Sequence, residues 1–303
     1  MNEIDIKKID CHAHPQFPGG PERVRGGTWP TPEEVIAIYK KLNVEKGVVM
    51  SRLAPERMHD PITSRDAEKI SKEYNEHFPV WFCALDPRMI WNGYHGKEAP
   101  NFSYYIDFYR ERGARGAGEI QANMYIDDKR MLAMLDQCAK KKFPVTIHFG
   151  KFGTGCGVAD DIGLVRLERV MEEFPDLCIF AHAQSFWSEM GGDVCEETRH
   201  GYPTGPIKEE GRIAKLLRKF PNLICDISAG SGYNALTRDL EYSYKFIDEF
   251  YEQIVFATDV SSPDLSNFEG LCEFLDNGYI SGNISTKAYR AICRDNAKRI
   301  LNM

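Results

Sequence analysis

Eight short apolar runs alternate with longer amphipathic stretches along this chain. Runs that recur roughly every 30 to 45 residues are typical of strand–helix–strand units and of the parallel sheets that these units build. Eight such units account for nearly the whole chain. The sequence therefore predicts an α/β fold, a (β/α)8 TIM barrel whose outline can be distorted. The predicted strands are 8–12, 47–51, 80–85, 114–120, 144–149, 177–182, 223–227 and 253–258.

The length of 303 residues lies within the range that one α/β barrel fills, so we expect a single barrel domain over residues 1–303. Two connections are longer than ordinary turns, 16–30 after the first predicted strand and 184–206 after the sixth. Both are rich in Gly and Pro. In a barrel they would lie at the C-terminal ends of the strands, where we expect them to wall or cover an active site rather than to be plain surface insertions.

The net charge of −7 gives the chain no basic surplus for binding phosphates, so we expect a small-molecule substrate and no nucleic-acid partner. No run approaches the roughly 18 apolar residues of a membrane span, and no signal-peptide pattern opens the sequence. The nine cysteines lack C-x-x-C spacing, which favours reduced thiols. We therefore expect a cytoplasmic protein without a membrane partner, with a homodimer as the default oligomer.

Two histidines close the first predicted strand, in the order Asp10-Cys11-His12-Ala13-His14. Because side chains alternate between the two faces of a strand, we expect His12 and His14 on one side and Cys11 and Ala13 on the other. Two imidazoles on one face can share a metal ion if further ligands arrive from elsewhere. Alone, this spacing is more often a pair of surface or packing histidines.

Three further residues of ligand type also close predicted strands. His148 ends the fifth strand, His182 ends the sixth and Asp259 follows the eighth. A single histidine at such a position is more often a hydrogen-bonded core residue than a ligand. The C-terminal ends of barrel strands converge on one face, however, so the set is expected to meet there and to form a metal site.

The order H-x-H, His, His and Asp on strands one, five, six and eight resembles the amidohydrolase superfamily. The flanking segments 9–14 and 256–259 resemble its amidohydrolase-2 branch, which also contains aminocarboxymuconate-semialdehyde decarboxylase. The resemblance spans the chain in strand order, although each motif is short. It implies a (β/α)8 barrel with a divalent metal, usually zinc, bound by His12, His14, one or both of His148 and His182, and Asp259.

Glu119 lies in the fourth predicted strand, where some members of the superfamily place a group that bridges two metals. In two-metal relatives this residue is often a carboxylated lysine, which is absent here and argues for one ion per chain. Glu119 is then a ligand of that ion, a hydrogen-bond partner that orients a ligand histidine, or a polar contact of the substrate.

A bound zinc ion lowers the pKa of its water towards about 7 and so supplies a nucleophile at neutral pH. The resemblance implies that Asp259 accepts the water's proton and passes it to the leaving group, while His182 is a weak ligand or polarises the scissile carbonyl. The first hypothesis is hydrolysis of a C–N or C–O bond in an amide, lactone or ester, in a small compound that can carry a carboxylate. The alternative is a non-oxidative decarboxylase of the aminocarboxymuconate-semialdehyde type, which uses the same ligand set. A barrel that binds a partner without catalysis is disfavoured, because all the ligand-type residues are present.

Four residues are candidates for contact with the substrate. Arg52 directly follows the second predicted strand, where its cation can pair with a substrate carboxylate, although a solvated surface arginine is the commoner case. Trp187, after the sixth strand, is expected either to wall the pocket or to pack in the core. Tyr233 and Asn234 follow the seventh strand in a stretch of small residues, where both can reach a polar substrate.

Overall fold

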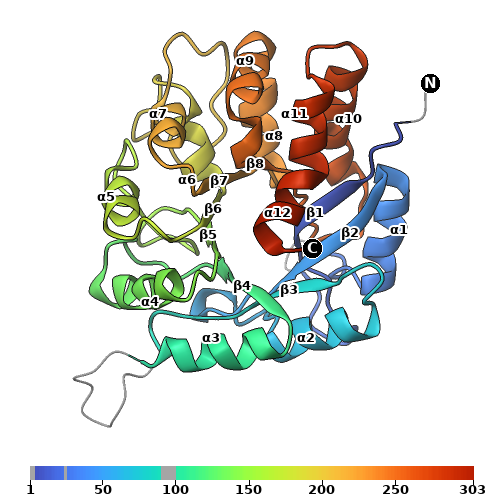
Figure 1. Ribbon diagram of the computed structural model, residues 1–303, viewed down its shortest axis with the longest axis vertical. Helices are drawn as coiled ribbons and strands as arrows, with labels where there is room; N and C mark the ends of the chain where they lie inside the picture. Colours follow the sequence, from blue (N-terminus) through green and yellow to red (C-terminus); the bar gives the residue numbers. More distant parts are fainter. Residues whose placement is uncertain (1–3, 24–25, 90–99) are drawn as a thin grey trace.

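The structure is a computed structural model that describes residues 4–23, 26–89 and 100–303. Eight parallel strands follow one another in a single sheet in chain order, which is the order of a (β/α)8 barrel (Figure 1). The predicted fold is therefore confirmed. The strands are β1 (Lys8–Ala13), β2 (Val44–Met50), β3 (Val80–Cys83), β4 (Ala114–Ile120), β5 (Val145–His148), β6 (Ile179–His182), β7 (Leu223–Asp226) and β8 (Ile254–Val255).

The barrel is closed by hydrogen bonds between β1 and the residues that follow the short strand β8. The N–H of Cys11 donates to the carbonyl of Phe256 at 3.0 Å, and the N–H of Asp259 donates to the carbonyl of His12 at 2.8 Å. The residues after β8 therefore continue the pairing with β1, although β8 itself is two residues long. This pairing places Asp259 beside His12 and His14.

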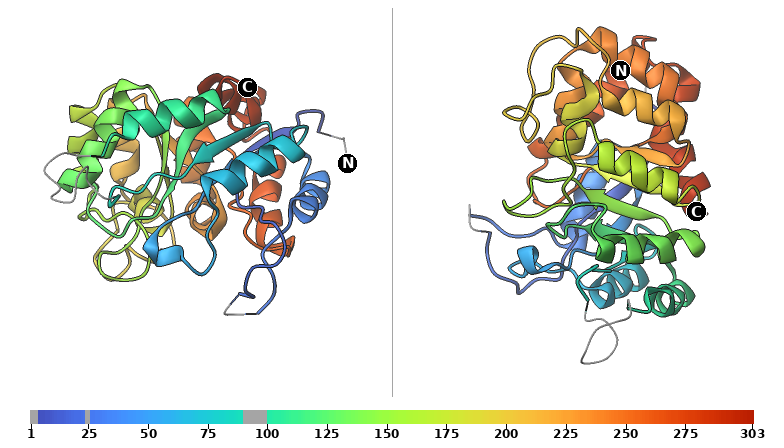
Figure 2. Two further views of the ribbon diagram at one scale, coloured as in Figure 1. Left: turned by 90° about the horizontal axis from the view of Figure 1, so that it is seen from below. Right: turned by 90° about the vertical axis from the view of Figure 1, so that its left-hand side faces the viewer.

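Helices cover the outside of the barrel (Figures 1 and 2). Helix α1 begins after Thr31, where the side chains of Thr31 and Glu34 accept hydrogen bonds from each other's backbone N–H groups in a capping box. The α-helices are α1 (Pro32–Leu42), α2 (Ser64–Glu73), α3 (Phe102–Glu111), α4 (Lys129–Lys140), α5 (Val165–Glu173), α6 (Gln184–Trp187), α7 (Arg212–Lys219), α8 (Ala229–Thr237), α9 (Leu240–Phe250), α10 (Ser266–Ile280), α11 (Thr286–Arg290) and α12 (Asn296–Leu301). Three 3₁₀ turns are η1 (Pro55–Arg57), η2 (Ser188–Met190) and η3 (Tyr251–Gln253), and one π-helical turn is η4 (Ala291–Asp295).

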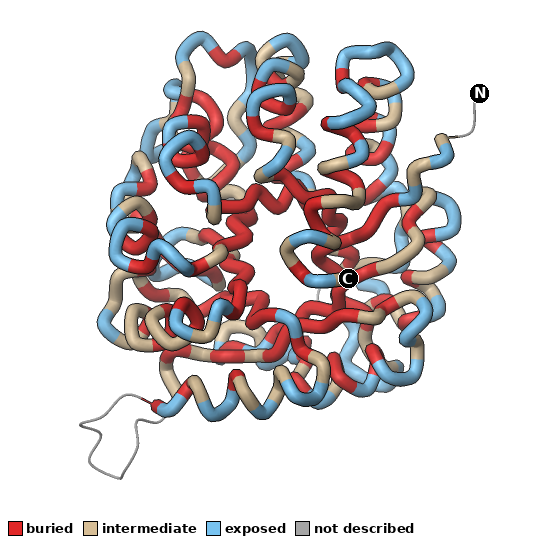
Figure 3. Tube along the Cα trace, in the orientation of Figure 1, coloured by how far each residue is buried: buried red, intermediate tan, exposed pale blue. Residues whose placement is uncertain are grey.

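The buried side chains form two clusters, one between the sheet and the helices and one inside the barrel, and the strands are buried along most of their length (Figure 3). Phe82 and Phe180 fill the inner cluster, where their rings meet edge to face. Ala297 and Leu301 of α12 join that cluster. Figure 2 shows α12 at one end of the barrel and the segment after β1 projecting from the other. One end is therefore plugged by a helix, and the other is left to the loops.

Two expectations need correction. Cys11 lies in the inner cluster with Ile9, not on the outer side with Ala13, because the register between β1 and β2 shifts between Asp10 and Ala13 and interrupts the alternation. The long connection predicted after the sixth strand is helical over its first part, where α6 and η2 occupy 184–190. Within the long connection after β1, residues 24 and 25 lie outside the described residues. No helix in the described part of the chain is long and apolar enough to cross a membrane.

Candidate metal centre

His12, in β1, and His14, directly after β1, point their Nε2 atoms toward each other. Their Nε2 atoms lie 3.0 Å apart, and both side chains are fully buried. The Nδ1 atom of His12 contacts the Asp226 carboxylate at 2.7 Å, and Nδ1 of His14 contacts the carbonyl of Met50 at 3.3 Å. Because these acceptors require a proton on Nδ1, both Nε2 lone pairs face each other and repel unless a proton or a metal cation lies between them.

Two carboxylates complete this group. The Oε2 atom of Glu119 and the Oδ1 atom of Asp259 each lie 3.3 Å from Nε2 of His14. The same oxygens lie 3.7 and 3.8 Å from Nε2 of His12. Glu119 comes from the end of β4 and Asp259 from the segment after β8, so strands on opposite sides of the barrel supply the group. The predicted meeting of strand ends therefore takes place at this point.

His182, from the end of β6, adds a third imidazole. Its Nδ1 contacts the hydroxyl oxygen of Ser228 at 2.9 Å. Its Nε2 atom is buried and has no hydrogen-bond partner among the described residues, and it lies 3.7 Å from Glu119 and 3.8 Å from Asp259. A buried polar atom without a partner is costly, so this nitrogen is suited to a ligand.

His148 lies at the edge of the group rather than in its middle. Its Nδ1 contacts Oε1 of Glu119 at 2.6 Å, and its side chain is 18% exposed. Gln121 donates from Nε2 to the other oxygen of Glu119, also at 2.6 Å. Both oxygens of this buried carboxylate are therefore held in place, and His148 reaches the other ligand residues through Glu119.

These distances fit a metal ion. Ligand atoms that share one ion at about 2.1 Å are roughly 3.0 Å apart in octahedral and 3.4 Å apart in tetrahedral geometry. Several of the contacts around His14 fall in or close to this range. Imidazole nitrogens and carboxylate oxygens suit zinc, manganese and iron alike. The residues that can hold an ion are His12, His14, Glu119, His148, His182 and Asp259.

The electrostatic field of the group attracts a cation. Burial alone lowers the pKa of His12, but the carboxylates of Asp226 and Glu119 together outweigh burial and raise that pKa well above its usual value. Burial alone raises the pKa of Asp259, but the neighbouring His14 and His12 hold it well below its usual range. His182 has no such close carboxylate contact, and burial lowers its pKa to about 4. Asp259 is thus an ionised carboxylate and His182 a neutral imidazole near neutral pH.

The sequence reasoning missed two carboxylates that support the ligands. Asp226, at the end of β7, holds His12 from behind, and its pKa is lowered by contact with that imidazole despite burial. Asp10 is fully buried and accepts hydrogen bonds from Tyr39 at 2.7 Å and from the backbone N–H of Thr258 at 2.9 Å. It thereby ties β1 to the segment that carries Asp259. Asp226 closes an apolar strand just as Asp259 does, and this signal could have identified it.

Arg52 lies beside the centre, as its position after β2 predicts. Its guanidinium is 1% exposed and forms an ion pair with Asp60 at 2.6 Å, while its Nε has no hydrogen-bond partner among the described residues. Burial lowers the pKa of Arg52, and the charges of Asp60, Glu119 and Asp259 act in the opposite direction. Arg52 is therefore not a solvated surface arginine, because its side chain is buried.

The other three candidate substrate residues differ in their surroundings. Trp187 is buried in the core, and its indole N–H donates to the carbonyl of Asp226 at 2.9 Å. Asn234 donates to the carbonyl of Pro203 at 3.0 Å and so anchors the loop after β6. Tyr233 is 41% exposed and lines a cavity of about 210 Å³ that also includes Thr258, the neighbour of Asp259. Trp187 and Asn234 thus have structural contacts, whereas Tyr233 is accessible to a ligand.

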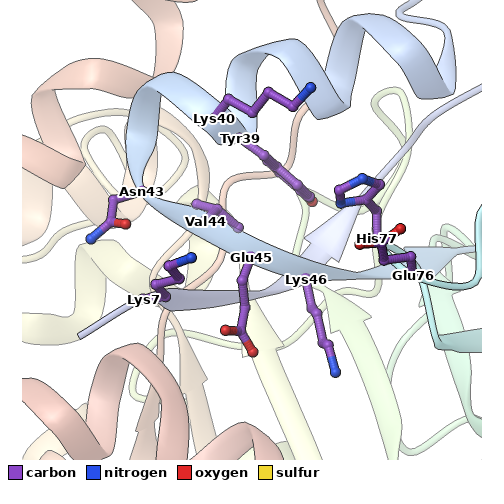
Figure 4. Close-up of a pocket in the computed structure, with 9 residues that line it drawn as sticks. All are labelled: Lys7, Tyr39, Lys40, Asn43, Val44, Glu45, Lys46, Glu76 and His77. Carbon is purple, nitrogen blue, oxygen red and sulfur yellow. The ribbon is translucent and has the colours of Figure 1, made fainter. Parts of the chain in front are cut away.

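A larger hollow of about 490 Å³ lies elsewhere, between α1 and β2 (Figure 4). Charged side chains such as Lys40 and Glu76 line much of it, and the hydroxyl of Tyr39, which also lines it, is already bonded to Asp10. The six candidate ligands are absent from its lining. This hollow is therefore not the candidate active site, although it is larger than the cavity beside Tyr233.

Comparisons with known proteins agree with this description. The profile of a family described as amidohydrolase matches residues 110–303, more than half of the chain. No curated protein matches the sequence. Several solved structures of the same fold match this structure, at low sequence identity.

Three of these structures are informative about the range of relatives. A probable 2-pyrone-4,6-dicarboxylic acid hydrolase from Acinetobacter baumannii, with citric acid bound, is 10% identical and has a TM-score of 0.60, covering 98% of this chain and 100% of its own. The 5-carboxyvanillate decarboxylase of Sphingomonas paucimobilis is 14% identical with a TM-score of 0.60, covering 99% and 100%. A dihydroxybenzoic acid decarboxylase from Polaromonas sp. JS666, with bound manganese and the inhibitor 2-nitroresorcinol, is 14% identical with a TM-score of 0.58, covering 98% and 97%. At such identities the likeness shows the fold alone.

Proposed function

Since the chain belongs to the amidohydrolase family, we propose that it is a metal-dependent hydrolase that cleaves a C–N or C–O bond of a small carboxylated compound. The observation that carries this proposal is the convergence of His12, His14 and His182 with two carboxylates at the mouth of the barrel. One divalent ion bound there, such as zinc or manganese, lowers the pKa of a water molecule and so supplies a nucleophile at neutral pH.

Asp259 is the proposed general base. It is the more exposed of the two carboxylates in the group, with 21% of its side chain accessible, and it is ionised at neutral pH because its pKa is held low. An ionised carboxylate at the edge of the group can take a proton from a water molecule and return it to the leaving group. His182, whose Nε2 is free and neutral, would bind the ion or polarise the scissile carbonyl. An ionised Asp259 can act directly as the base in this reaction.

Arg52 is the proposed anchor of the substrate carboxylate. A buried guanidinium with an unused Nε donor next to a metal centre can pair with an anion that lies between it and the ion. Tyr233, whose cavity also includes Thr258 beside Asp259, would contact the same substrate. Contacts of Trp187 and Asn234 with the substrate remain predictions, as do a homodimer and a cytoplasmic location.

The alternative is non-oxidative decarboxylation. Solved structures of the same fold include decarboxylases that act on dihydroxybenzoate and 5-carboxyvanillate, and a metal-binding set of this kind suits either reaction. In that case a protein group must deliver a proton to carbon as CO₂ leaves, which is an acid role.

The two reactions are distinguished by the atoms that solvent contributes. Metal-loaded protein would be incubated with lactones, amides and aromatic carboxylates in H₂¹⁸O and, separately, in D₂O, with products analysed by mass spectrometry. Hydrolysis predicts one ¹⁸O in a product and no CO₂. Release of CO₂ with deuterium on the carbon that lost it would overturn hydrolysis and establish the alternative. The same assay would be run on Asp259→Asn, which removes the proposed base. Its matched control is Asp295→Asn, which removes an exposed carboxylate paired with Arg290.

A further inference from the structure

The hollow between α1 and β2 lies where the first strands of the barrel begin, whereas the metal centre lies where the strands end (Figure 4). Lys7 directly precedes β1, Lys46 lies near the start of β2, and His77 lies shortly before β3. Tyr39 and Lys40 come from α1. The volume of about 490 Å³ is within the range of roughly 300 to 1,000 Å³ that holds small molecules. A ligand bound here would not compete with a substrate for the metal centre.

Two walls of this hollow are fixed by hydrogen bonds. The side-chain amide of Asn43, which lines it, donates to the carbonyls of Ile4 and Ile6 at 3.0 and 3.3 Å and so holds the segment before β1. The backbone N–H of Gly47 donates to the carbonyl of His77 at 2.8 Å and holds the segment before β3. The hollow is therefore formed by the protein itself, and a ligand would not have to order these walls when it binds.

Tyr39 and Val44 line the hollow with apolar groups. The hydroxyl of Tyr39 donates to the buried Asp10 at 2.7 Å, so its proton is not available to a ligand. The tyrosine also lies directly against the backbone of β2, because a Cβ atom on Gly47 would be 2.3 Å from the hydroxyl oxygen. Specific recognition of a ligand in this hollow must therefore come from the charged side chains around these two residues.

The charged side chains around the hollow do not neutralise one another. Three lysines line it and form no ion pair with a described residue: Lys7, Lys40 and Lys46. Of the two carboxylates in the lining, Glu45 is paired at 2.9 Å with Arg294, which lies outside the lining. With His77 counted as neutral, Glu76 is left to offset three ammonium groups, so two positive charges remain in excess on a chain whose net charge is −7. A dianion would neutralise this excess.

We propose that this hollow is a second ligand site, which binds an elongated molecule with an anionic group at each end. Figure 4 shows the ammonium groups of Lys40 and Lys46 on opposite sides of Tyr39 and Val44, so two separate anionic groups fit them better than one compact anion. An ammonium group binds carboxylate and phosphate alike, as a point charge. The expected ligand is therefore a dicarboxylate or a bisphosphate with an apolar middle. This site goes beyond the proposed hydrolase activity and does not depend on it.

The test compares adipate, which has a carboxylate at each end, with hexanoate, which has the same length and one carboxylate. In calorimetric titrations of the metal-loaded protein, we expect one adipate per chain, bound at least about tenfold more tightly than hexanoate, because a contact with a charged group contributes roughly a factor of ten. The bisphosphate of 1,4-butanediol is titrated in parallel, and the tighter of the two dianions identifies the anionic groups of the ligand. If neither dianion binds more tightly than hexanoate, the inference is wrong.

Substitutions in the lining locate the bound dianion. Lys40→Gln and Lys46→Gln should each weaken adipate binding about tenfold, whereas Lys245→Gln, at an exposed pair elsewhere, should leave it unchanged. Glu76→Gln removes the opposing charge and should tighten adipate binding. Both lining lysines are at least partly exposed, so neither substitution should unfold the chain. Removal of the metal with a chelator should leave adipate binding unchanged. Unchanged binding in both lysine variants, or its loss with the metal, would place adipate elsewhere and overturn the inference.

Discussion

Both ends of the barrel bury polar side chains, yet they do so in different ways. At the end plugged by α12, Lys8 is fully buried, and its ammonium donates to the carbonyl of Leu42 at 3.2 Å and to Asp276 at 3.0 Å. Tyr289 donates to the other oxygen of Asp276 at 2.6 Å. At the opposite end, His182 Nε2 and Arg52 Nε are buried without hydrogen-bond partners among the described residues. The paired groups at the plugged end stabilise the fold, whereas the two unpaired nitrogens beside the candidate ligands are suited to contact with a ligand.

The largest effect on activity is expected at the open end of the barrel, where Asp259 is the proposed base. Asp259→Asn should lower kcat/KM by a factor on the order of 10³, because the amide cannot accept the proton of the attacking water. The free energy of unfolding should change little, since the side chain is at the open end of the barrel. Steady-state kinetics and urea unfolding measure the two quantities. Activity within tenfold of the wild type would contradict the assigned role.

The opposite result is expected at the plugged end. Lys8→Met should lower the free energy of unfolding by about 2 to 4 kcal/mol, because it leaves Asp276 without its buried cation. Metal content and kcat/KM of the folded variant should match those of the wild type. Lys245→Met removes an exposed pair with Glu241 and should cost less than about 0.5 kcal/mol in the same assay. A loss of bound metal in the Lys8 variant would show that the two ends are not independent.

Asp226 contacts the Nδ1 atom of the candidate ligand His12, and its replacement tests whether this contact affects metal binding. Asp226→Asn keeps an oxygen that can accept the hydrogen bond from His12 but removes the charge that makes the imidazole a stronger ligand. Its metal affinity should fall by about 10- to 100-fold, measured by competition with a chromogenic chelator. Asp295→Asn serves as the charge-matched control. If the metal affinity is unchanged, Asp226 does not tune the ligand and has only a structural role.

The smallest effect is expected where the fold and the site meet. Tyr39→Phe removes one donor to Asp10, which keeps the hydrogen bonds from Thr258. The unfolding free energy should fall by about 1 to 2 kcal/mol. Metal affinity should change by less than threefold, because Thr258 still ties β1 to the segment that carries Asp259. A larger fall in affinity would mean that Tyr39 sets the position of the ligands.

The sequence predicted the barrel because its eight apolar runs become eight strands, and strand order alone then brings the strand ends together. The same reasoning identified His12, His14 and Asp259, which the structure brings within hydrogen-bonding distance or little more. It failed for Cys11, because a register shift between neighbouring strands leaves no trace in the pattern of one strand.

The partners behind the ligands could not be predicted in the same way. Asp10 and Asp226 act through contacts with residues more than two hundred positions away, Thr258 and His12, and such contacts exist only once the barrel closes. The two oxygens of Glu119 face different histidines, His14 and His148, and this depends on side-chain orientation, which the sequence does not specify. The candidate ligands could be identified from their positions at strand ends, whereas their contacts could be identified only from the structure.

The central claim is that the open end of the barrel binds a catalytic metal, and elemental analysis of the purified protein tests it most directly. Cells would be grown with zinc, manganese and iron in the medium, and the wild type would be compared with His12→Ala and His77→Asn. We predict at least one divalent ion per chain in the wild type and in His77→Asn, and a marked loss in His12→Ala. Wild-type protein that carries no metal and binds none when zinc or manganese is added would contradict the account, and the buried histidines would then have to act as acid–base or structural groups.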